Sequence, residues 1–109
     1  MALHHAKAGE IVDLKPLGKD LPNSRTTAIV KSEAFEAVRL VIPAGKDLPA
    51  HEVSGDITLH CLEGRVALDL ADTTLELRAG EWIYLEGGAN HSVKGIEDSS
   101  LLLTILFDR

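Results

Sequence analysis

The sequence contains a single cysteine, Cys61, so no disulfide can form within the chain. Cys61 lies in an apolar run, residues 57–62, where a thiol normally behaves as a small buried hydrophobe rather than a nucleophile. Basic residues are also few: eleven Lys and Arg stand against seventeen Asp and Glu, giving a formal net charge of -6. This balance argues against nonspecific binding to nucleic acid or to anionic lipid, because both need clustered positive charge.

Long hydrophobic runs are missing as well. No segment approaches the length of a membrane span, and the N-terminus lacks the apolar stretch of a secretory signal. We therefore expect a cytoplasmic protein. There is also no glycine-rich phosphate loop, nucleophile-elbow serine or HExxH zinc motif, so no organic cofactor is implied.

The sequence does contain many short apolar runs. Val, Ile, Leu and Thr cluster between turns marked by Gly and Pro, which recur about every ten residues. Residues 65–70 and 73–78 alternate between apolar and polar positions and are predicted to form a hairpin. With 45% hydrophobic residues in 109, the chain can bury one core. These features predict an all-β single domain, either a sandwich or a barrel.

Two of the apolar runs, residues 82–85 and 101–107, are hydrophobic on both strand faces. A small barrel exposes one face of each strand to water, so such runs indicate a second layer of protein. The simplest second layer is another copy of the chain, and we predict a homodimer. Trp82 and Tyr84 are accordingly expected in the core or at an interface.

Two glycine-led segments, residues 45–51 and 80–91, each end in a histidine. Both lie where a turn leads into a strand-like run. Glycine adopts backbone conformations that cost other residues energy, and imidazole is the commonest metal ligand in proteins. The pattern predicts that His51 and His91 converge inside a small barrel.

These segments resemble the two sequence motifs of the cupin superfamily, specifically of its small single-domain bacterial members. The residues that fit the motifs are Gly45, His51, Gly64, Gly80, Gly88 and His91. The resemblance spans about residues 34–107 and implies an antiparallel jelly-roll β-barrel. On this basis residues 1–109 form one domain, with residues 1–24 packing on the sheet or extending it.

The resemblance also implies a metal site of histidines and one carboxylate, from which this sequence departs. Val53 and Ile57 stand where the family has its second histidine and its glutamate, so only His51 and His91 carry over. We predict His60 as a further ligand, which requires a bulge near residues 55–56. In the ordinary register, a period of two places His60 on the opposite face of its strand. Asp56 and Glu52 are the alternative carboxylate ligands.

The predicted function is a small-molecule site at the barrel mouth, with a divalent metal held by His51, His91 and His60. Fe, Zn, Mn and Ni all suit such ligands. A catalytic version would be a dioxygenase- or isomerase-like enzyme acting on a small organic compound. The alternative is a non-catalytic, metal-free cupin that binds a small ligand or partner. Arg39 could bind a carboxylate substrate or form an ion pair with Glu36 or a neighbour.

Overall fold

The computed structural model describes residues 5–51, 54–88 and 90–107, with only the backbone of residues 49–51. It contains one short 3-10 helix and nine strands within these ranges. The elements in chain order are η1 (Gly18–Asn23), β1 (Thr27–Lys31), β2 (Phe35–Ile42), β3 (Asp47–His51), β4 (Ile57–Glu63), β5 (Arg65–Leu70), β6 (Thr74–Arg78), β7 (Trp82–Leu85), β8 (His91–Gly95) and β9 (Ser99–Leu106). The described helical structure has neither the length nor the apolarity needed to cross a bilayer.

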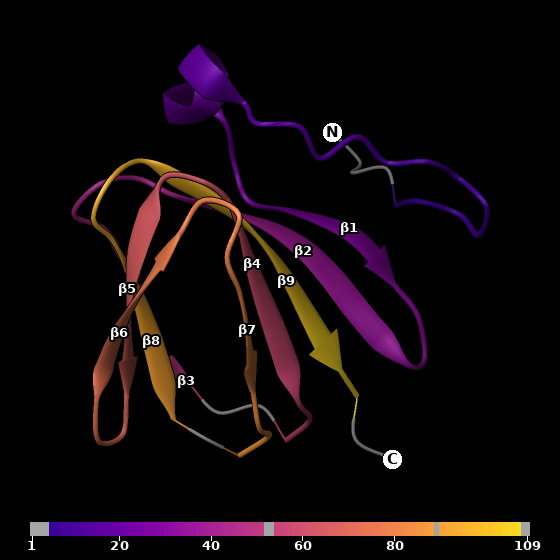
Figure 1. The fold of residues 1–109 in the computed structure, drawn as a ribbon. Coiled ribbons are helices and arrows are strands. Elements are labelled where there is room, and N and C mark those ends of the chain that lie inside the picture. Colours follow the sequence, from indigo (N-terminus) through magenta and orange to yellow (C-terminus); the bar gives the residue numbers. More distant parts are fainter. Residues whose placement is uncertain (1–4, 52–53, 89, 108–109) are drawn as a thin grey trace.

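The strands form two antiparallel sheets that face each other (Figure 1). One sheet has the order β1-β2-β9-β4-β7, and the other has the order β3-β8-β5-β6. The all-β jelly-roll prediction is therefore confirmed. The expected hairpin is formed by β5 and β6, in which Val66 lies opposite Leu77 and Leu68 opposite Leu75.

The core lies between the sheets and follows the predicted alternation. In β4, Ile57, Leu59 and Cys61 are buried, whereas the residues between them are only half-buried. Val66 and Leu68 of β5 oppose them from the other sheet and are fully buried. Burial also raises the pKa of the Cys61 thiol, which agrees with the expectation of an inert side chain.

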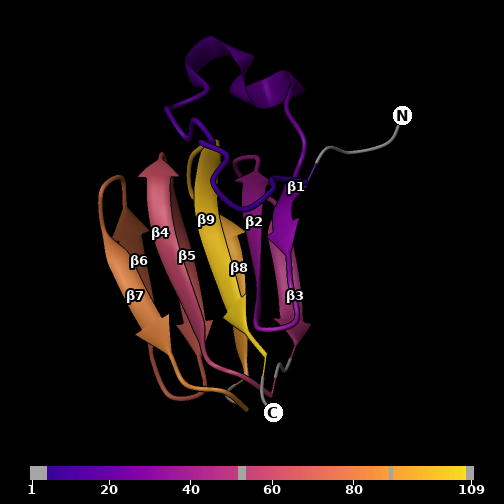
Figure 2. The same cartoon turned by 90° about the vertical axis from the view of Figure 1, so that its right-hand side faces the viewer.

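An N-terminal arm, residues 5–17, crosses one end of the five-stranded sheet (Figure 2). The backbone N–H of Ala6 donates to the carbonyl oxygen of Ile29 in the edge strand β1. At the far end of the arm, η1 buries the side chain of Leu21. The arm thereby lies against the outer surface of the sheet rather than between the two sheets.

Candidate functional site

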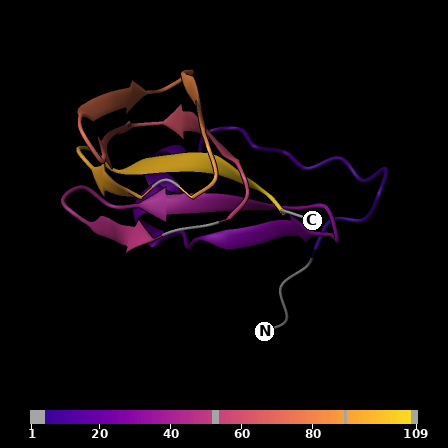
Figure 3. The ribbon, with the colours of Figure 1, turned by 90° about the horizontal axis from the view of Figure 1, so that it is seen from below.

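One end of the barrel, at the bottom of Figure 1, brings together two of the three predicted histidine positions; Figure 3 looks onto this end. Strand β3 ends here at His51 and β8 begins here at His91. Strand β4 also begins at this end, and β7 finishes here. We call this end the mouth of the barrel.

The structure places His51 and His91 directly opposite each other in adjacent antiparallel strands. Further along the same pair, Leu48 lies opposite Val93, and the register shifts by one residue between the two pairs. Without this irregularity position 50 would face His91, because successive residues of a strand alternate between faces. A bulge in β3 therefore brings position 51 into register with His91.

His91 belongs to the inner face of its sheet. It alternates with Ser92 and Lys94, and it shares its face with Val93, which is part of the core. The His91 side chain is only 5% exposed. It borders a small pocket of about 160 Å³ that is also lined by Leu70 and Asn90, and by Asp69 and Ser92 of the outer face. The imidazole is therefore buried at the edge of the core, next to this pocket.

The wall of the mouth opposite His91 is apolar. Ile57, at the position of the family's glutamate, is 3% exposed and packs in the core together with Leu85. Among the described residues no three His, Cys, Asp or Glu side chains are grouped closely enough to hold a metal ion. The described part of the mouth thus supplies one imidazole side chain in an apolar setting, with Glu52 and Val53 outside the described residues.

Asp56 lies at the mouth, but its carboxylate holds the surrounding segments together through hydrogen bonds. One oxygen accepts a hydrogen bond from the backbone N–H of Gly87 at 2.8 Å, and the other accepts from the Tyr84 hydroxyl at 3.1 Å. The hydrogen bond to this carboxylate raises the pKa of Tyr84. A side chain at position 87 would overlap the backbone oxygen of Ser54, so glycine permits the close approach of the two loops. Asp56 therefore acts here as a structural acceptor.

His60 does not join the other two histidines. It lies opposite Trp82 in β7 and Leu102 in β9, on the outer face of the five-stranded sheet. No bulge reverses the face of β4 before it, because Ile57 and Leu59 alternate regularly into the core. The bulge on which the prediction of His60 as a ligand depended does not precede it in β4, and of the three predicted positions the structure brings together those of His51 and His91.

Arg39 also lies away from the mouth, in a polar cluster that the sequence did not reveal. Its guanidinium is paired with Glu63 rather than Glu36, with an Nη2–Oε2 distance of 3.5 Å. The same Nη2 donates to the carbonyl oxygen of Lys15 at 2.7 Å. The Arg39 guanidinium is thus already bound to Glu63 and Lys15 and is not available to a substrate at the mouth.

Glu63 is the centre of this cluster. Its carboxylate accepts hydrogen bonds from the backbone N–H groups of Leu17 and Gly18 and from the hydroxyl of Ser100. Burial alone would raise the pKa of Glu63, but these three donors and the charge of Arg39 together lower it below its ordinary value. The cluster fastens the arm to the barrel, since Lys15, Leu17 and Gly18 are bound through their backbone atoms.

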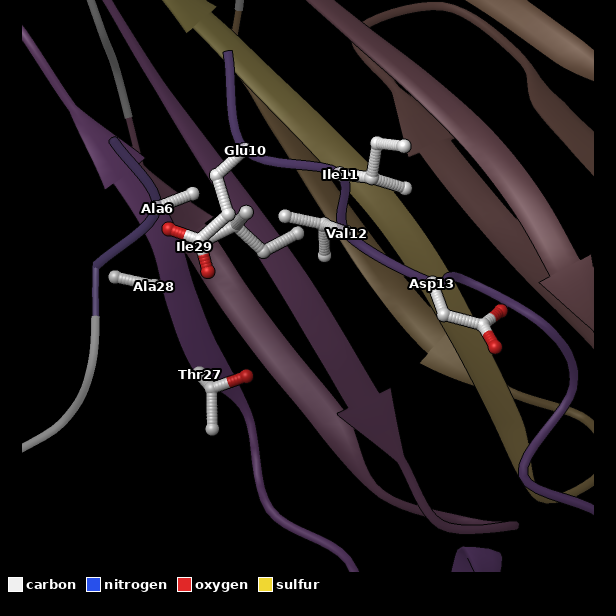
Figure 4. Close-up of a pocket in the computed structure, with 8 residues that line it drawn as sticks. All are labelled: Ala6, Glu10, Ile11, Val12, Asp13, Thr27, Ala28 and Ile29. Carbon is white, nitrogen blue, oxygen red and sulfur yellow. The ribbon is translucent and has the colours of Figure 1, made fainter. Parts of the chain in front are cut away.

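A larger pocket, of about 400 Å³, lies between the arm and β1 (Figure 4). Val12 and Ile29 turn toward each other across it, whereas Ile11 turns away. Its two carboxylates are already used locally: Glu10 accepts from the N–H of Lys7, and Asp13 accepts from the N–H of Lys15. The mouth therefore remains the stronger candidate, because it combines the paired histidine positions with an apolar wall.

Solved structures with this fold are similar along most of the chain. A cupin superfamily protein from Desulfitobacterium hafniense is 16% identical with a TM-score of 0.76, covering 90% of this chain and 95% of the other. An RmlC-like cupin from Methanocaldococcus jannaschii, described as a double-stranded β-helix, is 18% identical with a TM-score of 0.74 and coverages of 90% and 93%. KdgF from Halomonas sp. is 16% identical with a TM-score of 0.70 and coverages of 77% and 80%.

These identities establish the shared fold, and no curated protein matches the sequence closely enough to add an activity. The sequence itself matches the model of the cupin domain over residues 38–107. This match includes most of the barrel, both histidines of the mouth and the segments that carry the two glycine-led motifs. The chain belongs to the cupin family.

Proposed function

We propose that this cupin binds a small organic molecule at the mouth of its barrel, beside a divalent metal held by His51 and His91. The observation that carries the proposal is the register of β3 and β8, which sets these two positions opposite each other. Directly opposed residues of an antiparallel pair have Cβ atoms about 4.5–5.5 Å apart. Two imidazoles at that spacing suit neighbouring positions around one metal ion.

The residues of the mouth fit part of a metal site. Two histidines can be supplied by the paired positions, and the apolar wall formed by Ile57 and Leu85 would limit access of water. Open coordination positions are typical of catalytic rather than structural metal sites. A divalent metal, when bound, would supply Lewis-acid or oxygen-activating chemistry of the kind used by isomerase- and dioxygenase-like enzymes. The histidines would hold it, and the wall would orient the apolar part of the substrate.

A second candidate is a metal-free cupin that binds a small ligand without turnover. The observation that favours it is Ile57, which is buried where the family has a carboxylate. Without a third protein ligand, His91 would serve as a hydrogen-bonding group for an oxygen of the ligand. The apolar wall would then provide most of the contact area, as is usual in small-molecule pockets.

Metal content distinguishes the two candidates. The chain should be purified without a histidine tag or chelator, dialysed against Fe(II), Zn, Mn or Ni in turn, and analysed for metal per chain. We expect near-stoichiometric binding of at least one metal. Losing the outer hydrogen-bond partner of a metal ligand typically lowers metal affinity about 10–100-fold. Replacing a ligand itself should lower the metal affinity by at least as much. His51→Ala and His91→Ala should both show this loss.

His60→Ala is the matched control, because it removes an imidazole from the outer face of the barrel. It should retain the metal, and all three variants should be compared by thermal melting to identify unfolding. Absence of bound metal in the folded wild-type protein would overturn the metal site and favour the metal-free candidate. Loss of metal in His60→Ala alone would place the binding site on the outer face instead.

A further inference from the structure

The two sheets are not joined along one side of the barrel. Each sheet ends there in an edge strand, β6 for the four-stranded sheet and β7 for the five-stranded sheet. The two strands are linked by a short turn but belong to different sheets (Figure 1). A pocket of about 410 Å³ lies on this side, and its lining includes Leu75 and Glu76 of β6 and Ile83 of β7. We call it the side pocket.

The side pocket is apolar where it meets the interior of the barrel. Leu75 lies opposite Leu68, whose side chain is fully buried in the core, yet Leu75 itself is 40% exposed. Ile83 lies opposite the buried Leu59 and borders the pocket from the other sheet. These inner-face side chains are accessible because neither sheet continues beyond its edge strand. The pocket can therefore take an apolar side chain from outside.

The free edge of β6 presents backbone hydrogen-bonding groups beside the side pocket. In an antiparallel ladder, only every second residue pair exchanges hydrogen bonds. At the hairpin turn, the N–H of Leu70 donates to the carbonyl oxygen of Thr73. The next hydrogen-bonded pair is that of Leu75, so Thr74 and Glu76 direct their N–H and C=O groups away from β5.

The rest of the edge confirms this alternation. Arg78, two residues after Glu76, donates its N–H to the carboxylate of Glu81 at 2.8 Å, and its carbonyl oxygen accepts from the N–H of Glu81 at 2.9 Å. On the opposite side of the barrel, the edge strand β1 is met by the arm, where Ala6 donates to Ile29. No described strand pairs with the free edge of β6 in this way.

The charges around the side pocket favour a cation at one end of it. The carboxylate of Glu76 is already paired with Arg65 at 3.4 Å and with Arg78 at 2.9 Å. Glu81, which also lines the pocket, forms no ion pair with a Lys or Arg of the described residues. Beside it, Trp82 lines the pocket and is 59% exposed, and an indole ring attracts cations over its face.

We propose that the side pocket binds an extended segment of another protein, which adds as a strand to the free edge of β6. The backbone of this segment pairs with Thr74 and Glu76. Every second side chain of the segment points into the pocket against Leu75 and Ile83 and is apolar. A basic residue of the segment lies next to Glu81.

An extended peptide meets all of these requirements together. A small apolar molecule would fill the pocket but leave the edge groups of Thr74 and Glu76 without partners. Main-chain hydrogen bonds provide affinity in this mode of binding, and pockets for alternate side chains provide specificity. The residues that hold the segment differ from the histidines proposed to hold a metal, so the two proposals can fail separately.

A synthetic peptide tests the proposal. It has eight residues, with valine and threonine alternating between a lysine at each end. Trp82 is the only tryptophan, so its fluorescence reports occupation of the side pocket. Binding should also slow hydrogen exchange at the amides of Thr74 and Glu76 by at least about 10-fold, measured by NMR. Unchanged exchange at both amides in the presence of saturating peptide would overturn the proposal.

Glu76→Pro and Glu76→Thr form a matched pair of variants. Both remove the carboxylate, but only proline removes the edge N–H, and proline is tolerated where that N–H faces away from the ladder. Glu76→Pro should bind the peptide about 10-fold more weakly, whereas Glu76→Thr should bind it as the wild type does. Equal affinities for the two folded variants would overturn pairing with β6. Leu75→Asn, which makes the pocket polar, should also weaken binding about 10-fold and covers the case in which Glu76→Pro does not fold.

Glu81→Gln tests the charge preference. It keeps an acceptor oxygen for the N–H of Arg78 and removes the negative charge. The wild type should prefer the lysine peptide to its glutamine analogue, and Glu81→Gln should not; equal affinity of the wild type for both peptides would overturn the basic residue. A wild-type mass of twice 11.7 kDa without peptide, with the Thr74 and Glu76 amides already protected, would assign the edge to a second copy and overturn the proposal.

Discussion

Glu63 provides the sharpest test of how the arm is attached to the barrel. Its side chain is 13% exposed and that of Arg39 is 11% exposed, so the pair is largely removed from water. The Glu63 carboxylate also accepts hydrogen bonds from Leu17, Gly18 and Ser100. A side chain that replaces Glu63 must therefore offer the same acceptor oxygens. Glu63→Gln keeps the shape but places an amide NH₂ against these donors and leaves the Arg39 charge uncompensated.

The expected cost follows from these contacts. Hydrogen bonds to a charged group contribute about 1.5–3 kcal/mol, and breaking a buried ion pair costs about 3–5 kcal/mol. Because Gln retains one acceptor oxygen and the pair is not fully buried, we expect a loss of about 2–3 kcal/mol in the free energy of unfolding. For a chain of this size that corresponds to a fall of roughly 10 °C in Tm, measurable by circular dichroism.

Glu97→Gln is the matched control. Glu97 pairs with Arg65 at 3.4 Å, but its side chain is 59% exposed, and exposed pairs contribute about 0–1 kcal/mol. The pH dependence adds a second test. The pKa of Glu63 is lowered on folding, so its contribution is complete above the unfolded carboxyl pKa and is lost as pH falls through the folded value. The stability difference between wild type and Glu63→Gln should therefore shrink below about pH 4.5. Equal melting temperatures for Glu63→Gln and Glu97→Gln at neutral pH would refute the reasoning.

Two further substitutions test the loops around the barrel. Asp56→Ala removes the acceptor for Gly87 and Tyr84, so the protein should lose about 1–3 kcal/mol of stability. The pKa of the single tyrosine, followed by ultraviolet titration, should fall toward 10.0. An unchanged titration would contradict the contact between Tyr84 and Asp56. Gly64→Ala should cost about 2–4 kcal/mol in chemical denaturation, because φ is +84° and the new Cβ would overlap the backbone oxygen of Asp98. Gly80→Ala has φ of +88° but open space around it, and should cost only about 1–2 kcal/mol.

The fold was accessible from the sequence because strand alternation is a local property. The buried positions of β4 and β5 could be identified from the spacing of Leu59, Cys61, Val66 and Leu68 alone. The same alternation placed His60 on the outer face unless a bulge intervened, and the structure shows regular pairing there. Predictions that depended on a period of two within one strand therefore hold.

The polar cluster could not be predicted in this way. Arg39 and Glu63 are 24 residues apart in sequence and lie on β2 and β4, which are separated by β9 in the sheet. Their contact depends on strand order, on Ser100 between them and on the backbone of the arm. The sequence shows only a basic residue in one apolar strand and an acidic residue at the end of another. A charged residue in the middle of an otherwise apolar strand is nevertheless a sign of a buried partner, because an unpaired buried charge is very costly.

The paired histidine positions depend on a single extra residue. A regular pairing of β3 with β8, continued from Leu48 and Val93, would set position 50 opposite His91 and turn position 51 to the other face. The bulge reverses this, and no residue type in that stretch specifies a bulge unambiguously. The glycine-led motif indicates that a turn precedes the strand, but not how many residues the strand accommodates before the mouth. The local path of β3 therefore decides whether His51 can act with His91. For this reason the metal content of His51→Ala tests the bulge in β3 as well as the role of His51 as a ligand.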